Sequence, residues 1–261
     1  MAYVVVCAAA IVVAALTLFS GFGLGTLLMP VFALFFPIEV AVAATAVVHL
    51  ANNLFKVGLV GRNADRGVFI RFAVPAAAAG VVGALLLTYV AALAPLARYT
   101  LWGQEHSVTA VGLVIALLMA GFALFELLPR FERLSFDRRY LPLGGALSGF
   151  FGGLSGHQGA LRSAFLINAG LTKDAFIATG VMAAVAVDVV RLIVYGVVFI
   201  GRHWEALPPG GFSLVGAATL AAFLGSFLGA RLVKKVTLQT VQRVVGVMLL
   251  VVAIALGAGL A

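Results

Sequence analysis

Hydrophobic residues form long runs along this chain, and short polar stretches separate them. Six runs are long enough for an α-helix that crosses a bilayer, which takes ~20 residues. They cover residues 38–60, 68–93, 108–128, 175–200, 212–233 and 244–260. The pattern therefore predicts six transmembrane helices.

Two further apolar stretches are interrupted by residues that disfavour helix. Residues 1–37 carry no charge but contain Gly21, Gly23 and Gly25, followed by Pro30. Residues 141–168 contain the glycine-rich segment 149–159. Glycine costs a helix ~1 kcal/mol and proline ~3 kcal/mol relative to alanine. Each stretch is therefore predicted as two half-helices joined by unwound chain.

Composition places nearly all of the chain in the membrane. Hydrophobic residues make up 64% of it and charged residues 10%, against ~45–50% and ~25% in soluble domains. The mean hydropathy is +1.18. A soluble domain must cover itself with polar side chains, so these values exclude one. We expect an all-α polytopic membrane protein.

Charge and cysteine content exclude several other classes of protein. The net charge is +8, but the basic residues lie in short loops and not on one face of a soluble domain, so nucleic acid is not expected as a partner. Cys7 is the single cysteine, which excludes an intramolecular disulfide and CxxC metal sites. We expect neither metal nor cofactor. Residues 1–20 lack the basic start of a signal peptide and are taken as structure.

The distribution of basic residues predicts the topology. Three loops carry most of them and are expected in the cytoplasm. Their basic residues are Lys56, Arg62, Arg66 and Arg71, then Arg130, Arg133, Arg138 and Arg139, and finally Arg231, Lys234, Lys235 and Arg243. The connections 95–107 and 201–211 hold one arginine each. For all three basic loops to share one side, residues 141–168 must enter and leave on the same face, as a re-entrant hairpin or as two short spans. Both termini then lie outside.

The two halves of the chain resemble each other in the order of their motifs. Gly25 and Thr45 correspond to Gly159 and Thr179, and the Gly80–Gly83 pair corresponds to Gly225 and Gly229. These glycine pairs favour helix packing. We expect a first repeat, 1–128 (broken hairpin 1–37), a basic cytoplasmic linker, 129–140, and a second repeat, 141–261 (broken hairpin 141–168). Each repeat has three spans after its hairpin, so the repeats are inverted, as is typical of secondary transporters.

The two glycine-rich breaks resemble the repeated signature of the TauE/SafE membrane proteins. The resemblance also covers the apolar run after each break and the helices with Ala44-Thr45 and Ala178-Thr179. The chain departs from the family pattern at Pro30 and at His157-Gln158, where small residues are commoner. The resemblance implies a transporter of the cell membrane that exports small sulfur-containing anions such as sulfite and sulfoacetate.

Arg162 is the leading candidate for binding such an anion. It lies three residues after Gly159, in the first turn of the predicted second half-helix. Free backbone N–H groups and the positive end of the helix dipole favour an anion there, and guanidinium fits two of its oxygens. The alternative is a structural arginine that ties the hairpin to backbone carbonyls or to Asp188.

Other polar side chains in apolar segments are candidates because ionisable groups in a bilayer are costly. Asp188 and Arg191 are spaced i, i+3, which allows either a simple ion pair or a role in proton coupling. His49, Asn53 and Lys56 share one helix face, for anion binding or, for Lys56, for extension to the cytoplasmic boundary.

The breaks themselves hold the remaining candidates. Unwound chain at membrane depth occurs where it lines a cavity or is buried in protein. The candidates for substrate binding there are Ser155, His157, Gln158, Gly159, Gly21, Gly23 and Gly25. Each glycine is equally well explained as a helix break.

We expect a transporter that works by alternating access and is not an enzyme. An anion channel and a transporter of an unrelated anion are the alternatives. A remote alternative is an intramembrane serine protease, because Gly153-Leu154-Ser155-Gly156 has the GxSG pattern. The expected partners are a small anionic substrate and the lipid bilayer, with a homodimer as a candidate assembly.

Overall fold

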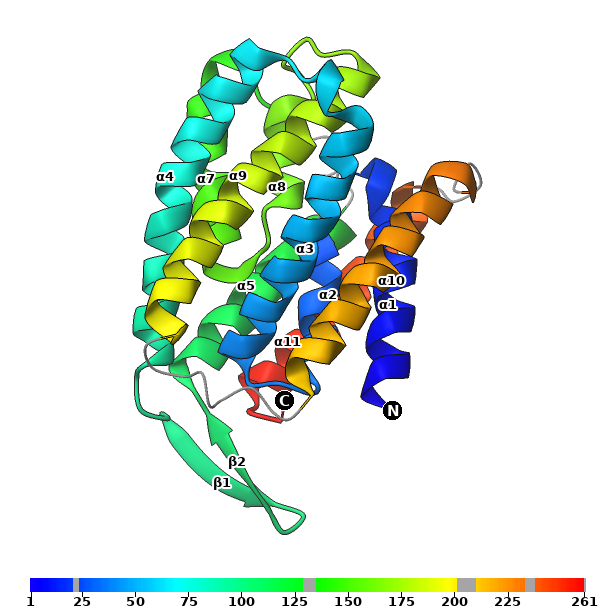
Figure 1. The fold of residues 1–261 in the computed structure, drawn as a ribbon. Helices are drawn as coiled ribbons and strands as arrows, with labels where there is room; N and C mark the ends of the chain where they lie inside the picture. Colours follow the sequence, from blue (N-terminus) through cyan, green and yellow to red (C-terminus); the bar gives the residue numbers. More distant parts are fainter. Residues whose placement is uncertain (21–23, 129–134, 201–209, 233–237, 261) are drawn as a thin grey trace.

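The computed structural model describes residues 1–20, 24–128, 135–200, 210–232 and 238–260, and these residues form a helical bundle with one β-hairpin (Figure 1). The first-half helices are α1 (Ala2–Ser20), α2 (Leu24–Ala33), α3 (Ile38–Val60), α4 (Arg66–Ala91) and α5 (Ala110–Leu127). The second-half helices are α7 (Leu141–Ser155), α8 (Gly159–Leu166), α9 (Lys173–Ile200), α10 (Gly211–Leu232) and α11 (Leu238–Gly257). Short 3₁₀ turns, η1 (Gly61–Asn63) and η2 (Arg138–Tyr140), precede α4 and α7.

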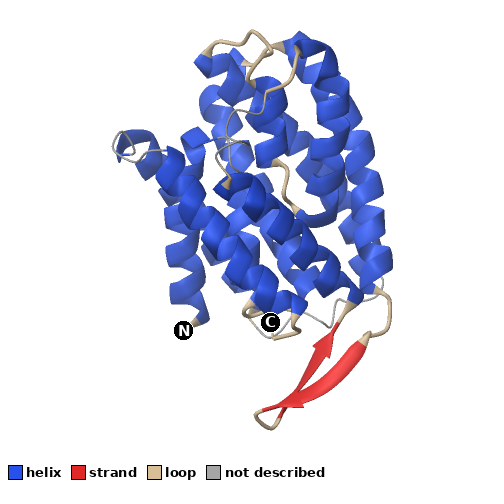
Figure 2. Ribbon diagram, turned by 180° about the vertical axis from the view of Figure 1, so that it is seen from behind, coloured by secondary structure: helices blue, strands red, loops and turns tan. Residues whose placement is uncertain are grey.

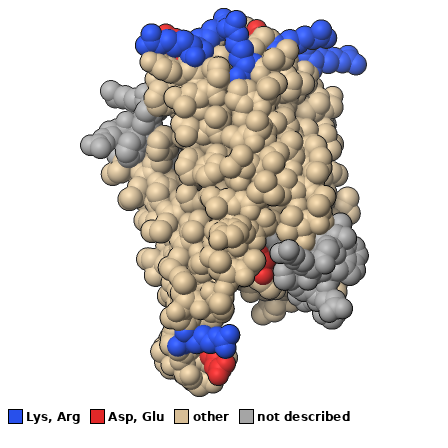
Figure 3. Space-filling view, turned by 90° about the vertical axis from the view of Figure 1, so that its left-hand side faces the viewer, with Lys and Arg blue, Asp and Glu red and all other residues tan. Residues whose placement is uncertain are grey.

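Four helices, α3, α4, α9 and α10, are long and apolar enough to cross a membrane. The described parts of α1, α5 and α11 contain shorter apolar helices. Figure 3 shows Lys and Arg gathered at one end of the molecule, with a broad uncharged surface below them. The exposed cations among the described residues at this basic end are Arg62, Arg66, Arg71, Arg138, Arg139 and Lys173. An uncharged belt below a basic end is the surface that a multi-pass membrane protein presents to lipid.

Glycines bring two pairs of helices into close contact. A Cβ added to Gly149 of α7 would lie 1.9 Å from the carbonyl oxygen of Ala76 in α4. A Cβ added to Gly225 of α10 would lie 2.2 Å from the carbonyl oxygen of Ile11 in α1. Such distances leave no room for a side chain, so glycine is required where these backbones meet. The packing role predicted for the second-half glycine pair is confirmed.

The glycines and the proline interrupt the helices less than the sequence suggests. Helix α7 continues through the glycines of segment 149–153 and ends only at Ser155. Gly149 and Gly153 pack against α4 and do not interrupt the helix. The break is confined to residues 156–158, where Gly156 adopts a φ of +82°. Pro30 lies within α2 and does not end it. Gly21 and Gly23 lie outside the described residues.

Helices α7 and α8, which precede and follow the break, pack against each other. The backbone N–H of Phe136, just before η2, donates to the carbonyl of Ala164 near the end of α8, at 3.2 Å. The rings of Phe136 and Phe165 stack with centroids 4.2 Å apart. The chain after α8 therefore returns to the end of the molecule at which α7 begins.

The sequence did not predict the β-hairpin of β1 (Ala97–Leu101) and β2 (Gln104–Val108), in a connection expected only as an outer loop. It projects from the helical body at the end that also holds both termini (Figures 1 and 2). The Tyr99 hydroxyl donates to the carbonyl of Ala258, which ties the hairpin to the end of α11. Helix α11 begins six residues before the predicted span, at Leu238.

Candidate functional site

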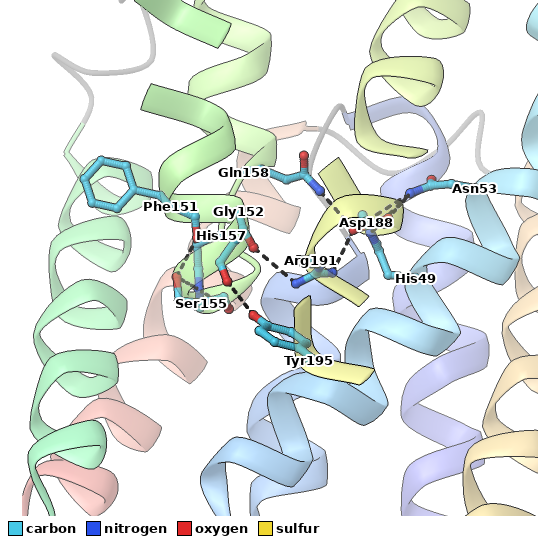
Figure 4. A network of polar contacts seen from close by, with 11 residues as sticks. His49, Asn53, Phe151, Gly152, Ser155, His157, Gln158, Asp188, Arg191 and Tyr195 are labelled. Atoms are coloured by element: carbon cyan, nitrogen blue, oxygen red, sulfur yellow. Dashed lines mark hydrogen bonds and ion pairs between the residues drawn. The ribbon is translucent and has the colours of Figure 1, made fainter. Parts of the chain in front are cut away.

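A cluster of buried polar side chains lies where the α7–α8 break meets α3 and α9 (Figure 4). Its members are His49, Asn53 and Lys56 of α3, Ser155, His157 and Gln158 at the break, Arg162 of α8, and Asp188, Arg191 and Tyr195 of α9. All are at most 7% exposed. We call this set the polar cluster.

Asp188 is the centre of the polar cluster. One carboxylate oxygen, Oδ2, lies 2.6 Å from Nδ1 of His49 and accepts from Nδ2 of Asn53 at 3.2 Å. The other, Oδ1, lies 2.8 Å from an Arg191 guanidinium nitrogen and accepts from Nε2 of Gln158 at 3.2 Å. Oδ2 thus has two nitrogen partners, and Oδ1 has one hydrogen-bond donor and the ion pair with Arg191, which together offset the cost of burying a carboxylate. The ion pair expected between Asp188 and Arg191 is present.

Arg191 and Tyr195 also bind the end of α7. A second Arg191 nitrogen donates to the carbonyl of Gly152 at 3.2 Å, and the Tyr195 hydroxyl donates to the carbonyl of Gly153. The Gly152 carbonyl also accepts from the backbone N–H of Gly156, so Arg191 adds a second donor to it. The Tyr195 hydroxyl provides a donor for Gly153, a carbonyl in the last turn of the helix. A Cβ on Gly156 would lie 3.0 Å from the Arg191 guanidinium, so the glycine also gives this side chain room.

The break is held by its own side chains. Nδ1 of His157 lies 3.1 Å from both the carbonyl and the hydroxyl oxygen of Ser155, and the His157 ring stacks on Phe122. Ser148 of α7 donates to the carbonyl of Gln158 at 3.0 Å. Nε2 of His157 and Oε1 of Gln158 are buried and have no hydrogen-bond partner among the described residues. The break therefore presents buried polar atoms that remain available to a ligand.

Two cations from different halves of the chain lie beside the break. Lys56 of α3 and Arg162 of α8 are 5% and 7% exposed, and they are close enough for their like charges to repel. Arg162 is in turn attracted by Asp188. The structure shows no hydrogen bond or ion pair between Lys56 and another described residue. The Lys56 side chain is buried.

A family model described as sulfite exporter TauE/SafE matches residues 6–256, nearly the whole chain. The chain belongs to the TauE/SafE family. No curated protein and no solved structure matches it. TauE/SafE proteins are membrane transporters and not enzymes. This chain is accordingly a multi-pass membrane transporter, with a small molecule as its substrate and the bilayer around it.

The Ser155–His157 contact does not make this TauE/SafE protein a hydrolase. The Ser155 hydroxyl donates to the carbonyl of Phe151 at 3.1 Å. Nδ1 of His157 is within bonding distance of a carbonyl, which can only accept, so that nitrogen carries the proton. It cannot also act as the base that a serine nucleophile requires.

The structure brings most of the predicted site residues of this TauE/SafE chain into the polar cluster. Gly159 begins α8. A Cβ on Gly25, in the first turn of α2, would lie 3.4 Å from the carbonyl of Gly156, so α2 begins beside the second break. Tyr195 was not among the predicted site residues. Its spacing of four residues from Arg191 and seven from Asp188 was the available signal, because those positions share a helix face.

A second buried contact in the TauE/SafE chain was also missed. Ser226 of α10 donates to the side-chain carbonyl of Asn52 in α3 at 2.7 Å, and both residues are fully buried. The Asn52 amide nitrogen and the Thr45 hydroxyl are buried with no hydrogen-bond partner among the described residues. Polar side chains of α3 thus contact α10, through Asn52, as well as α9.

Proposed function

We propose that this TauE/SafE protein exports small sulfur-containing anions, such as sulfite, sulfoacetate or related organosulfonates, across the cell membrane by alternating access. The observation that carries the proposal is the convergence of Lys56 and Arg162 beside the break. Lys56, Arg162 and Arg191 outnumber Asp188, the carboxylate of the polar cluster, and burying excess like charge is unfavourable unless a further counter-charge joins it. A transported anion provides that counter-charge.

The first turn of α8 adds neutral donors to the two cations. The first backbone N–H groups of a helix have no partner within it and lie at the positive end of its dipole. Arg162 lies in this turn, and Gly159, which begins it, has no side chain to block an approaching ligand. Guanidinium and free N–H groups together fit the oxygens of a sulfite or sulfonate group. His157 Nε2 lies in the same break as a further polar partner.

The contacts between helices support two inverted repeats. In chain order α1 to α5 correspond to α7 to α11. The contact of α4 with α7 then corresponds to that of α10 with α1, and the contact of α4 with α9 corresponds to that of α10 with α3. The pairs α3–α9 and α5–α11 each join equivalent helices. We propose that α7 and α8 form a re-entrant hairpin, that the two repeats have opposite orientations, and that both termini lie outside.

Alternating access follows from this arrangement. The polar cluster combines side chains of α3 in the first repeat with those of α8 and α9 in the second. Rocking one repeat against the other opens the cluster first to the cytoplasm and then to the outside. The exposed cations at the basic end attract anions toward the cytoplasmic entrance.

The test is flux of radiolabelled sulfite and sulfoacetate in proteoliposomes. We expect saturable flux from the wild type and at least a ~10-fold loss on Arg162→Ala, since charge-assisted hydrogen bonds are worth ~1.5–3 kcal/mol. Arg98→Ala is the matched control because that arginine is exposed on β1, away from the basic end, and its flux should be unchanged. Flux that does not saturate would favour the channel, and a folded Arg162→Ala protein with wild-type flux would remove Arg162 from the site.

A further inference from the structure

The donors that suit a transported anion are already occupied by a carboxylate. His49, Asn53 and Gln158, three of the predicted anion ligands, all bind Asp188, as does Arg191. We infer that the Asp188 carboxylate is a tethered substitute for the transported anion, which binds by displacing it while Asp188 takes up one proton. This inference rests on the proposed anion transport and adds its coupling step.

Shape makes the exchange feasible. A carboxylate presents two oxygens in a plane, and any two oxygens of a sulfite or sulfonate group present a similar pair. The groups around Asp188 form such a two-sided cradle, with His49 and Asn53 at one oxygen and Gln158 and the Arg191 cation at the other. The Arg191 guanidinium fits either kind of anion because its N–H groups form a planar fork.

Charge requires the proton. A sulfonate group that entered while Asp188 stayed ionised would bring a second negative charge into the same buried cradle. If Asp188 takes up a proton from water on the open side, its negative charge disappears as that of the substrate arrives. The net charge of the cradle that holds the sulfonate group is then unchanged. Protonated Asp188 also needs fewer donors, which frees those around it.

Other titratable and charged groups face Asp188 from each element packed against it. They are His49 of α3, Arg162 of α8, and Arg191 and Tyr195 of α9. Lys56 and His157 belong to the same polar cluster, near Arg162 and Ser155. Asp188 is the carboxylate among them, and its loss of charge is the one that offsets an incoming anion. Protonation of His49 instead would add a positive charge and leave Asp188 in the cradle.

The exchange of Asp188 for the anion also changes the contacts that hold the α7–α8 break. Arg191 joins Asp188 to the carbonyl of Gly152, and Gln158 joins Asp188 to the break directly. Release of Asp188 therefore frees two side chains that now fix the geometry of residues 152–158. Anion binding, proton uptake and movement of the α7–α8 break are linked through the same contacts.

The first experiment measures proton movement with the wild-type protein. Proteoliposomes containing a trapped pH-sensitive dye are given an inward gradient of sulfoacetate with the membrane potential clamped. We expect the lumen to acidify as sulfoacetate enters, with about one proton per anion, because binding of the two is coupled. Saturable sulfoacetate flux with no proton movement, or with protons moving the opposite way, would overturn the inference.

The second experiment measures sulfoacetate binding against pH. Wild-type affinity should rise up to ~10-fold for each pH unit of acidification between about pH 8 and pH 6, as one-proton linkage requires. Asp188→Asn keeps the shape but not the charge, so its affinity should vary less than ~3-fold over that range and exceed the wild type at pH 8. Asp174→Asn, at an exposed position in the first turn of α9, is the matched control and should behave as the wild type.

The outcomes separate the inference from the proposed function. If the wild type neither binds nor transports sulfite or sulfoacetate at any pH, the proposed function fails. If it transports them and binding does not depend on pH, only the exchange at Asp188 fails. Full pH dependence in Asp188→Asn that is lost in His49→Gln would place the proton on His49 and also overturn the inference. If Asp188→Asn does not fold, the proton measurement on the wild type still tests whether anion binding and proton uptake are coupled.

Discussion

Tyr195 shows how a single side chain holds unwound chain at membrane depth. Its hydroxyl donates to the carbonyl of Gly153, in the last turn of α7, while its ring is 2% exposed. Arg191, one turn earlier, binds the neighbouring carbonyl of Gly152. In hydrocarbon no water is available to such carbonyls, so the Tyr195 hydroxyl replaces a solvent contact at Gly153, while Arg191 adds to the backbone bond that Gly152 already accepts from Gly156.

Tyr195→Phe removes this donor without changing the ring. We expect the free energy of unfolding to fall by about 1–3 kcal/mol, because a buried carbonyl loses its partner. Thermal unfolding in detergent measures this, with Tyr89→Phe as the matched control, since Tyr89 is 67% exposed on α4. Equal melting temperatures for Tyr195→Phe and the wild type would show that the bond contributes nothing to stability.

Helices α4 and α7 illustrate glycine used for contact and not for interruption. Gly149 and Gly153 of α7 face the carbonyls of Ala76 and Gly80 at distances that exclude any Cβ. Apolar side chains gain little from leaving lipid for another helix, so close backbone packing stabilises helix pairs in membranes. A dense glycine run therefore marks a helix interface here, and only Gly156, with its positive φ, ends the helix.

Gly149→Ala should disrupt this interface. Its Cβ would lie 1.9 Å from a backbone oxygen, so α7 must move away from α4, and we expect a loss of at least about 2 kcal/mol in stability. The matched control is Gly121→Ala in α5, where an added Cβ meets nothing within 4 Å. Melting temperatures in detergent compare the two variants. A Gly149→Ala protein as stable as the Gly121→Ala protein would contradict the close contact.

The whole molecule separates its charges along one axis. Most exposed Lys and Arg in the described part of the chain lie at one end (Figure 3), and the β-hairpin, which carries Arg98 and Glu105, lies at the other end, beside both termini (Figure 1). Cytoplasmic loops of membrane proteins are enriched in Lys and Arg, so the basic end is assigned to the cytoplasm. We therefore expect the hairpin and the termini outside, as the proposed inverted repeats require.

Labelling of single cysteines tests this orientation. In a Cys7→Ala background, Thr100→Cys on β1 should react with an impermeant thiol reagent added to intact cells, because that position is exposed on the outer hairpin. Arg139→Cys, exposed in η2, should react only after the membrane is opened. The reverse pattern would invert the orientation, and labelling of both positions in intact cells would refute the charge argument.

Local hydropathy and spacing patterns in the sequence predict much of the architecture. Residues 38–60 were predicted as a span and form α3 with those bounds. The helical spacing of His49, Asn53 and Lys56 predicted one polar face, and all three are buried together. The break was predicted too long, since periodicity cannot distinguish a glycine that packs against another helix from one that ends its own. The β-hairpin was missed because its short polar strands are stabilised by pairing and by contact with α11.

The sequence by itself determined that this protein is a multi-pass membrane transporter, because hydropathy, loop charge and the TauE/SafE signature are properties of short segments. Only the tertiary structure decided which polar residues meet. Asp188 and Arg191 were expected to pair along one helix, but His49, Asn53 and Gln158 reach the same carboxylate from α3 and the break. The physical reason is that burying a charge in a bilayer requires donors on every side, and one helix supplies only those on its own face.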